Sequence, residues 1–284
     1  MRHSLEHLRS VQGEGDEATV SQPGNTTQAG ALIVNADDFG RNRETTDRIV
    51  ACAMCGSVSS TSAMVLMEDS QRAACLARER GIDCGLHLNF TAAYTMNSVS
   101  PSLVKHQGQI RRFLLRSTFA QILFHPGLVG SFQYVVAAQL EEYQRLYDKQ
   151  PDRIDGHHHM HLCANVLFGE LIPPGVIVRR SFSFLPGEKS WLNRAYRRWI
   201  DRRLARRYRL VDLMFSIEPF LRKGSLRRIV PLARHSVVEL ETHPVNPEEY
   251  RLLTSGELLD QLQGIEIMPS FAASMRKIRL AEAL

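Results

Sequence analysis

The sequence predicts a single-domain α/β fold in which about seven mainly parallel strands form an incomplete barrel. Three observations lead to this prediction. Short apolar runs alternate with longer runs of helical spacing along most of the chain. Hydrophobic residues make up 44% of the 284 residues, which is enough to bury a large core. No internal repeat and no linker divides residues 31–284, so one domain is expected there.

The predicted elements follow one another along the chain, separated by polar turns, glycines or prolines. Strands are expected where short apolar or β-branched runs occur, because such runs suit a buried parallel sheet. They cover residues 31–35, 58–66, 82–89, 153–156, 176–179, 237–242 and 265–268. Helices are expected over residues 44–55, 69–80, 110–124, 131–148 and 255–263, with a loop over 90–101.

The first 30 residues differ in composition from the rest of the chain. Residues 1–30 are poor in large apolar side chains, so they are expected to form a disordered leader. They lack the apolar stretch of a secretory signal. The sequence contains no run of about 18 apolar residues, so no membrane span is expected. Five scattered cysteines, an odd number, do not suggest a disulfide framework. Together these features predict a cytoplasmic protein.

Two adjacent carboxylates, Asp37 and Asp38, follow the first predicted strand in the run NADDFG. Carboxylates at the end of an apolar strand are costly to bury without a cation or hydrogen bonds. A metal ion would satisfy one of them, and the other would then be available as a base. A helix N-cap is the alternative for one aspartate, and it leaves the second unexplained.

Histidines lie in or after the next predicted strands. His87 lies in the apolar run GLHLN and by itself suggests a hydrogen-bonded core residue. The run DGHHHMH holds four histidines in five positions, and neutral imidazole is a standard ligand of divalent metals. If this run is extended, alternate side chains share one face. These are Asp155, His157, His159 and His161.

A late predicted strand also ends in a histidine, His243, in the run ELETHP. The carboxyl ends of all strands of a parallel barrel meet at one rim, where barrel enzymes keep their catalytic groups. The aspartate pair, His87, the histidine run and His243 all fall at predicted strand ends. The sequence therefore predicts one metal-dependent site at this rim.

The four motifs, in this order, resemble those of the YdjC-like carbohydrate deacetylases, also called the ChbG/HpnK family. That family shows NADDFG after a strand, then GxHxNxT, then DxHxHxH and a late HP. Here the motifs lie at residues 35–40, 85–91, 155–161 and 243–244, and the resemblance extends over residues 31–270. It implies a distorted (β/α) barrel at residues 31–284 that removes an N-acetyl group from an amino sugar by hydrolysis and releases acetate.

The resemblance also implies roles for the matching residues. The metal ligands match Asp38, His87 and His157. Asp37 matches the catalytic base, His243 the general acid, and Arg179 an arginine near the active site. A second layer around the ligands, or contacts to the sugar, are expected of Asp155, His159, His161 and Asn89.

One aspartate and two histidines leave open positions on a divalent ion, as a hydrolytic site requires. The ion would supply Lewis acidity while Asp37 accepts a proton from the attacking water and His243 donates one to the departing amine. Zinc suits these ligands best, and magnesium, manganese, cobalt and nickel are alternatives.

The chain departs from the family pattern at two places. The Gly-x-Pro turn after the second motif reads AAYT here, and RNRET replaces the usual small polar segment after Gly40. Both places lie beside the predicted mouth of the site. The identity of the sugar is therefore left open.

Residues 190–209 form a basic amphipathic segment. Nine lysines or arginines occur from Lys189 to Arg209, and apolar residues recur there at helical spacing. Basic helices with tryptophan are typical of anionic membrane surfaces, which suggests peripheral membrane association and a lipid-linked sugar substrate. The alternative is a helix packed on the core with a solvated basic face. No nucleic-acid-binding motif surrounds the segment, so nucleic acid is not an expected partner.

Other function classes stay open on sequence grounds. A different metal-dependent amidase or a phosphoesterase would use a similar ion, although two-metal phosphoesterases usually need more carboxylates. A catalytically inactive sugar-binding relative would bind metal without turnover. A glycosidase is disfavoured, because Asp37 and Asp38 are neighbours in sequence and would not flank a glycosidic bond. The oligomeric state is unknown at this stage.

Overall fold

The computed structural model of the protein describes residues 30–184, 188–223, 226–262, 265 and 267–273. The leader expected over residues 1–30 lies outside the described residues except at Gly30, and so do residues 274–284 of the expected domain. None of the helices described is both long enough and apolar enough to cross a bilayer.

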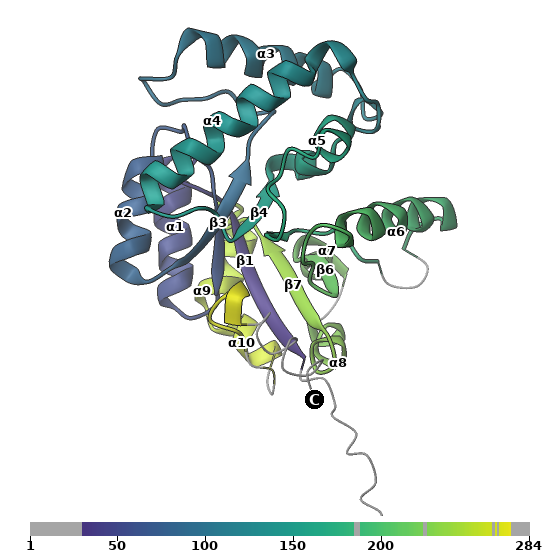
Figure 1. Ribbon diagram of the computed structural model, residues 1–284. Helices are drawn as coiled ribbons and strands as arrows, with labels where there is room; N and C mark the ends of the chain where they lie inside the picture. The colour runs from purple at the N-terminus through teal and green to yellow at the C-terminus, as the bar shows by residue number, and fades with distance from the viewer. Residues whose placement is uncertain (1–29, 185–187, 224–225, 263–264, 266, 274–284) are drawn as a thin grey trace, which may run out of the picture.

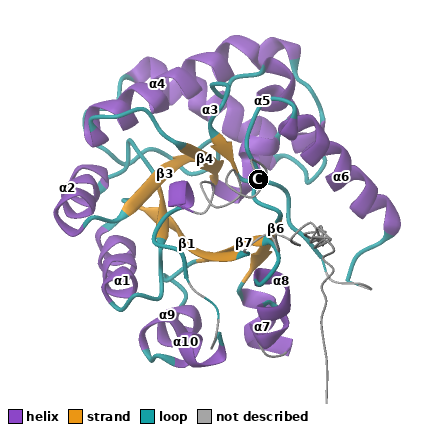
Figure 2. Cartoon of the chain, turned by 60° about the horizontal axis from the view of Figure 1, so that its bottom comes forward, coloured by secondary structure: helices purple, strands orange, loops and turns teal. Residues whose placement is uncertain are grey.

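In the described residues, seven parallel strands form one curled sheet (Figure 2). They are β1 (Ala31–Phe39), β2 (Ser60–Ala63), β3 (Asp83–Leu88), β4 (Arg153–Gly156), β5 (Ile177–Val178), β6 (Leu213–Ser216) and β7 (Val237–Thr242). Their order across the sheet is β5-β4-β3-β2-β1-β7-β6, and each neighbouring pair is parallel. The predicted α/β fold with seven mainly parallel strands is confirmed.

Helices surround the curled sheet (Figures 1 and 2). The α-helices are α1 (Arg43–Met54), α2 (Ser70–Arg80), α3 (Pro101–Leu115), α4 (Val129–Tyr147), α5 (Ala164–Gly169), α6 (Trp191–Ala205), α7 (Glu218–Lys223), α8 (Val230–Ala233), α9 (Pro247–Thr254) and α10 (Glu257–Gln261). The short 3₁₀ helices are η1 (Ala120–Ile122), η2 (Pro126–Leu128), η3 (His157–Leu162) and η4 (Leu226–Arg228). Because the strands are parallel, their carboxyl ends open on one side of the molecule.

β1 is the middle of the core, and all nine of its residues are buried. Leu32 and Val34 pack into the large apolar cluster, whereas Ala31 and Ile33 pack into a smaller one with residues of other strands. This alternation follows from the period of two residues in a strand. The carboxyl half of β1 is polar and equally buried, so its side chains need partners.

Backbone hydrogen bonds between residues 178–183 and residues 209–214 connect the two edges of the sheet. The backbone N–H of Val178, in β5, donates to the carbonyl oxygen of Arg209 at 2.9 Å. Further along, the N–H of Ser183 donates to the carbonyl oxygen of Met214, in β6, at 2.8 Å. These contacts curl the sheet toward closure without pairing β5 with β6 directly. The fold is a distorted (β/α) barrel.

Two sequence-based element assignments were wrong, and one strand was missed. Among the described residues of the strand predicted over 265–268, which exclude 266, the structure has an isolated bridge between Ile267 and Leu32, and the seventh strand is β6. β6 has four residues and follows the basic segment, so its short apolar run gave a weak signal. The helix expected over 110–124 begins at Pro101 and ends at Leu115, because proline fits the first turn and the Ser100 side chain caps it.

Candidate active site

Asp37 and Asp38 lie on a bulge at the carboxyl end of β1. The pairing register of β1 with β2 shifts between Ala36 and Phe39, and Asp38 has a φ of 71°. In a regular strand, neighbouring side chains point to opposite faces. The bulge re-aims the strand end. As a result, both aspartates come within ligand distance of His87.

Three ligand atoms converge beside this bulge. Oδ1 of Asp38 lies 2.9 Å from Nδ1 of His157 and 3.4 Å from Nε2 of His87, and all three side chains are buried. That carboxylate oxygen takes part in no hydrogen bond of good geometry. A buried oxygen without a partner is costly, and a divalent cation would satisfy it. The residues predicted as ligands therefore fit a metal ion.

Asp155, on β4, contacts His87 from the side away from Asp38. Its Oδ1 lies 2.8 Å from Nδ1 of His87, which leaves Nε2 facing the metal site. Its Oδ2 accepts hydrogen bonds from Oγ of Ser62 and from Nη1 of Arg153, both at 2.6 Å. Asp155 is fully buried, so it orients a ligand and is not exposed to a substrate.

Arg179 binds Asp37 through two parallel hydrogen bonds. Nη1 donates to Oδ2 at 2.6 Å and Nη2 donates to Oδ1 at 2.7 Å. Burial raises the pKa of Asp37, but the guanidinium of Arg179 and the ring of His87 together hold it well below the usual aspartate value. Asp37 is therefore ionised. The Arg179 side chain is itself completely buried, so it acts through the carboxylates that it binds.

Besides Asp37 and Asp155, two glutamates also contact the guanidinium of Arg179. Arg179 also donates from Nε to Glu239 at 2.7 Å and from Nη1 to Glu241 at 3.2 Å. Burial raises the pKa of Glu239 to about 7, and burial together with Asp37 raises that of Glu241 to about 8. These shifts come mainly from burial, and the neighbouring carboxylates add to them. A bound cation would favour the ionised form of these carboxyl groups.

His243 stands beside Asp37 at the mouth of the site. Nε2 of His243 lies 4.0 Å from Oδ2 of Asp37, and its side chain is 38% exposed. Burial lowers the pKa of His243, but Asp37 and Glu241 raise it by more, so that it lies above 6.5. The rim thus pairs an ionised carboxylate with a histidine that stays protonated above the usual range.

The histidine run is not extended, and the prediction that alternate residues share one face was wrong beyond Gly156. Residues 157–162 form η3, in which His158 and His159 have φ values of 55° and 58°. The turn folds the run back on β4, so that a Cβ on Gly156 would lie only 3.0 Å from His161. Glycine suits this close approach because it has no side chain.

Besides His157, η3 directs two more of its histidines toward the site. Nε2 of His159 lies 3.2 Å from Oε1 of Glu241, and Nε2 of His161 lies 3.0 Å from the carbonyl oxygen of Arg179. Burial lowers the pKa of both histidines to about 3, so both are neutral. His161 therefore donates to the backbone of Arg179 and fixes its position.

Asn89 uses its side chain within its own loop. Oδ1 accepts from the backbone N–H groups of Thr91 and Ala92, and Nδ2 donates to the carbonyl oxygen of Ala92. Its backbone N–H donates to Oε1 of Gln139 at 2.7 Å, and the residue is fully buried. Asn89 therefore shapes the loop after β3 and does not present its amide to a substrate.

Sequence reasoning missed Arg153 as part of the site. Its guanidinium is buried and donates to Asp155, Ser62 and Ser60. A Cβ on Gly85 would lie 2.7 Å from Cζ of Arg153, so that glycine makes room for it. The sequence did contain a signal for it, because Arg153 lies in a strand that was predicted to be buried. A charged residue is rarely buried without partners, so a buried ion pair could have been expected there.

Sequence comparisons match this chain to one family model and to proteins named as deacetylases. A family model described as "YdjC-like protein" matches residues 31–268. A Serratia marcescens protein named chitooligosaccharide deacetylase is 35% identical over 136 residues, which cover 48% of this chain and 52% of that protein. A Mus musculus protein named carbohydrate deacetylase is 28% identical over 207 residues, which cover 68% of this chain and 62% of that protein. The chain spans about half the length of the bacterial relatives that it matches.

A solved structure shares the fold. The crystal structure of a candidate cellobiose-phosphate cleavage protein from Enterococcus faecalis V583 matches with a TM-score of 0.59 and 20% identity. The match covers 84% of this chain and 97% of that one, and at this identity it shows the fold alone. The family model, in contrast, extends over all four motifs and all seven strands. This chain belongs to the YdjC-like protein family.

Proposed function

We propose that this chain removes an N-acetyl group from an amino sugar by metal-dependent hydrolysis, releasing acetate and a free amine. One observation carries the proposal. A buried Asp38, His87 and His157 cluster lies beside an ionised Asp37 and a more exposed His243. The names of its deacetylase relatives support the same reaction. The arrangement suits hydrolysis because a ligand cluster, a base and an acid share one rim.

Asp38, His87 and His157 would hold one divalent ion. Zinc suits one carboxylate and two imidazoles best, and magnesium, manganese, cobalt and nickel are the alternatives. When bound, the ion supplies Lewis acidity toward the acetamide oxygen and the attacking water. His87 must lose a proton to bind it, since Asp37 and Asp155 outweigh burial and raise the pKa of His87 to about 10.

Asp37 would accept the proton of the attacking water. Its pKa is held low, and Arg179 fixes both of its oxygens, so its orientation is set before substrate arrives. Arg179 is a positioning residue in this scheme, because no part of its side chain is exposed. Glu239 and Glu241 hold the remaining edges of the guanidinium.

His243 would donate a proton to the departing amine. Its pKa lies above 6.5, and its exposed side chain is able to reach a bound molecule. Asp155 and His161 would act behind the ligands, one on His87 and the other on Arg179. His159 borders the mouth, where its ring packs against Phe182 at 4.4 Å.

Acetate release tests the proposal directly. The protein, loaded with zinc, is assayed on free N-acetylglucosamine, on its oligomers and on lipid-linked N-acetylated sugars. We expect release from at least one of them, and loss of both bound zinc and turnover in His157→Ala. The control is His235→Ala, an exposed histidine outside the site, which is expected to keep both.

Three outcomes would contradict the proposal. Full turnover in His157→Ala would remove the metal assignment. Phosphate release from phosphate esters without acetate release would indicate a phosphoesterase. Zinc and sugar binding without any turnover would indicate an inactive relative.

We also propose a cytoplasmic location and a peripheral association of residues 190–209 with anionic membranes. The basic character of α6 supports this, and it would suit a sugar carried on a lipid. Fractionation of cells into soluble and membrane parts, at low and high salt, tests the location. Recovery from the periplasm or medium would contradict it.

A further inference from the structure

Large apolar side chains lie exposed on three segments that are far apart in sequence. Their exposed fractions run from 40% at Tyr196 to 69% at Trp191. They come from the α3–α4 connection, from α5 and from α6, and we call them the aromatic surface: Phe119, Ile122, Leu123, Phe124, Phe168, Trp191, Leu192, Tyr196 and Trp199. Clustered exposed apolar groups of this kind mark interaction surfaces.

Four rings of this surface, one or more from each of the three segments, form a continuous chain of contacts. Phe124 lies 6.4 Å from Phe168, Phe168 lies 6.2 Å from Trp199, and Trp199 lies 6.3 Å from Tyr196, between ring centroids. In both views α5 lies between the α3–α4 connection and α6 (Figures 1 and 2). The surface is therefore one patch built by the tertiary fold.

α6 contributes four of the nine residues of this patch, because it packs only one side against the body. Ile200 and Leu204 are buried, as the amphipathic pattern predicted. Trp191, Leu192 and Trp199 belong to the same apolar pattern but are exposed. The alternative that this apolar face packs entirely on the core therefore fails for its N-terminal half.

Positive charge lies beside the part of the aromatic surface that α5 and α6 form. α6 carries five arginines and one acidic residue, Asp201, and that carboxylate is already bound by Arg180 and Ser181. The guanidinium of Arg203 stacks over the ring of Phe168 at 4.8 Å. Aromatic rings with flanking arginines suit an interface that is apolar on one side and anionic on the other.

We propose that the aromatic surface docks the protein on the surface of a bilayer that contains anionic phospholipids. The aromatic side chains would enter the boundary between headgroups and acyl chains, and the arginines would contact lipid phosphates. The charge pattern favours a membrane over a second copy of this chain, because two copies would bring their arginines together. The inference gives the proposed association of residues 190–209 a defined surface and does not depend on the hydrolytic activity.

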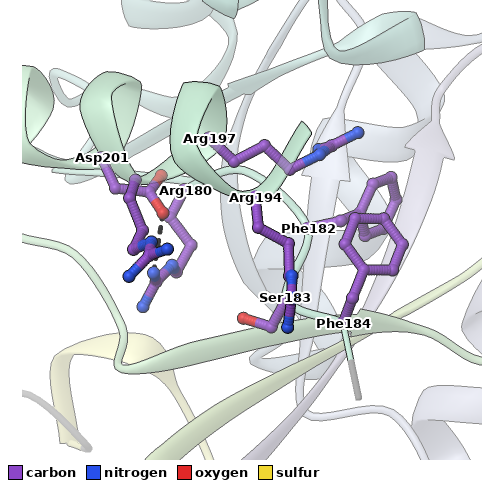
Figure 3. Close-up of a pocket in the computed structure, with 8 residues that line it drawn as sticks. Arg180, Phe182, Ser183, Phe184, Arg194, Arg197 and Asp201 are labelled. Carbon is purple, nitrogen blue, oxygen red and sulfur yellow. Dashed lines mark hydrogen bonds and ion pairs between the residues drawn. The ribbon is translucent and has the colours of Figure 1, made fainter. Parts of the chain in front are cut away.

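Docking in this way would bring the catalytic rim close to the headgroups. Arg194 and Arg197 of α6, together with Phe182 and Phe184 from the segment before it, line a cleft of about 260 Å³ (Figure 3). Phe182 also packs against His159 at the mouth of the site. The cleft therefore lies between α6 and a side chain that contacts the mouth of the candidate active site.

Co-sedimentation with vesicles tests the proposal at physiological salt. The full chain is mixed with vesicles of phosphatidylcholine alone or with added phosphatidylglycerol. We expect binding only to the anionic vesicles, and weaker binding at high salt. Trp191→Ser with Leu192→Ser should reduce binding about tenfold or more, since two large exposed side chains leave the interface.

Matched variants separate a local effect from a general one. Val104→Ser with Leu259→Ser removes two similarly exposed apolar groups elsewhere and should bind as the parent does. Arg198→Gln with Arg202→Gln should weaken binding about tenfold or more, whereas Arg80→Gln with Arg234→Gln should not. Thermal melting identifies any variant that fails to fold.

Several results would overturn the docking proposal without touching the hydrolase proposal. These are absence of binding to anionic vesicles, equal binding to neutral ones, or equal loss in both apolar double variants. A dimer in sedimentation velocity that Trp191→Ser with Leu192→Ser dissociates would assign the surface to a second copy instead. Acetate release from soluble substrates is measured separately and does not enter this test.

Discussion

At the scale of single residues, the site depends on how Arg179 distributes its hydrogen bonds. One buried guanidinium contacts Asp37, Glu239, Glu241 and Asp155. Removing it would leave several carboxylates in a low-dielectric interior without their counter-ion. The same group therefore supports both the stability of the fold and the orientation of the base.

The first prediction concerns that guanidinium. Arg179→Met should lower the free energy of unfolding by about 3–5 kcal/mol, because it leaves buried charges uncompensated. Urea denaturation followed by circular dichroism measures this. Arg234→Met, at an exposed arginine, should change stability by less than about 0.5 kcal/mol. A loss below about 1 kcal/mol for Arg179→Met would show that the network is not needed for stability.

The second prediction concerns pH. His243 must be protonated to act as an acid, and its pKa lies above 6.5 because Asp37 and Glu241 outweigh burial. Acetate release should therefore persist above pH 6.5 and decline as the pH rises through the pKa of His243. His243→Ala should lower kcat by about 10²–10⁴-fold and remove that alkaline limb. His235→Ala should leave the limb in place, and an unchanged limb in His243→Ala would exclude its acid role.

At the scale of elements, two glycines in helical regions have opposite roles. Gly81 ends α2 with a φ of 66°, which is unfavourable for a residue with a side chain. Gly108 lies inside α3, where glycine weakens a helix. A Cβ at either position would meet no atom within 4 Å, so packing does not obscure the comparison.

The third prediction follows from this pair. Gly81→Ala should destabilise the protein by about 1–2 kcal/mol, since alanine pays the cost of a left-handed backbone. Gly108→Ala should instead stabilise it by up to about 1 kcal/mol. Thermal unfolding of the two variants beside the parent protein measures both. The same sign for both substitutions would contradict the conformational explanation.

At the scale of the whole molecule, the candidate metal site joins distant parts of the chain. Asp38 lies near the carboxyl end of β1, His87 near the carboxyl end of β3, and His157 begins η3 after β4. An ion bound by all three would bind the folded state and not the unfolded chain. Metal binding should therefore stabilise the fold as a unit.

The fourth prediction tests this coupling. Zinc at about 100 times its dissociation constant should add about 2.7 kcal/mol to the free energy of unfolding, and a chelator should reverse it. Differential scanning calorimetry measures the shift. His157→Ala should show no such shift, and an equal shift in that variant would place the ion elsewhere.

The sequence by itself determined the local features of this protein. The alternation of apolar runs predicted most strands, and the residue types at their ends predicted a metal-dependent site of aspartates and histidines. The family resemblance then singled out Asp38, His87 and His157, which lie together in the structure. The local inferences were possible because strand burial and metal-ligand chemistry depend on neighbouring residues. The expected face shared by Asp155, His157, His159 and His161 failed because η3 turns instead of extending.

Tertiary structure decided the rest, because it depends on contacts between residues far apart in sequence. The pairing of Asp37 with Arg179 joins residues 142 positions apart, and no local pattern specifies it. Contacts between distant residues likewise place Arg153 behind Asp155 and pair the short strand β6 with β7. They also bring the α3–α4 connection, α5 and α6 together in the aromatic surface. Local chemistry therefore indicated the kind of site, and the packing of the barrel determined how its residues are held.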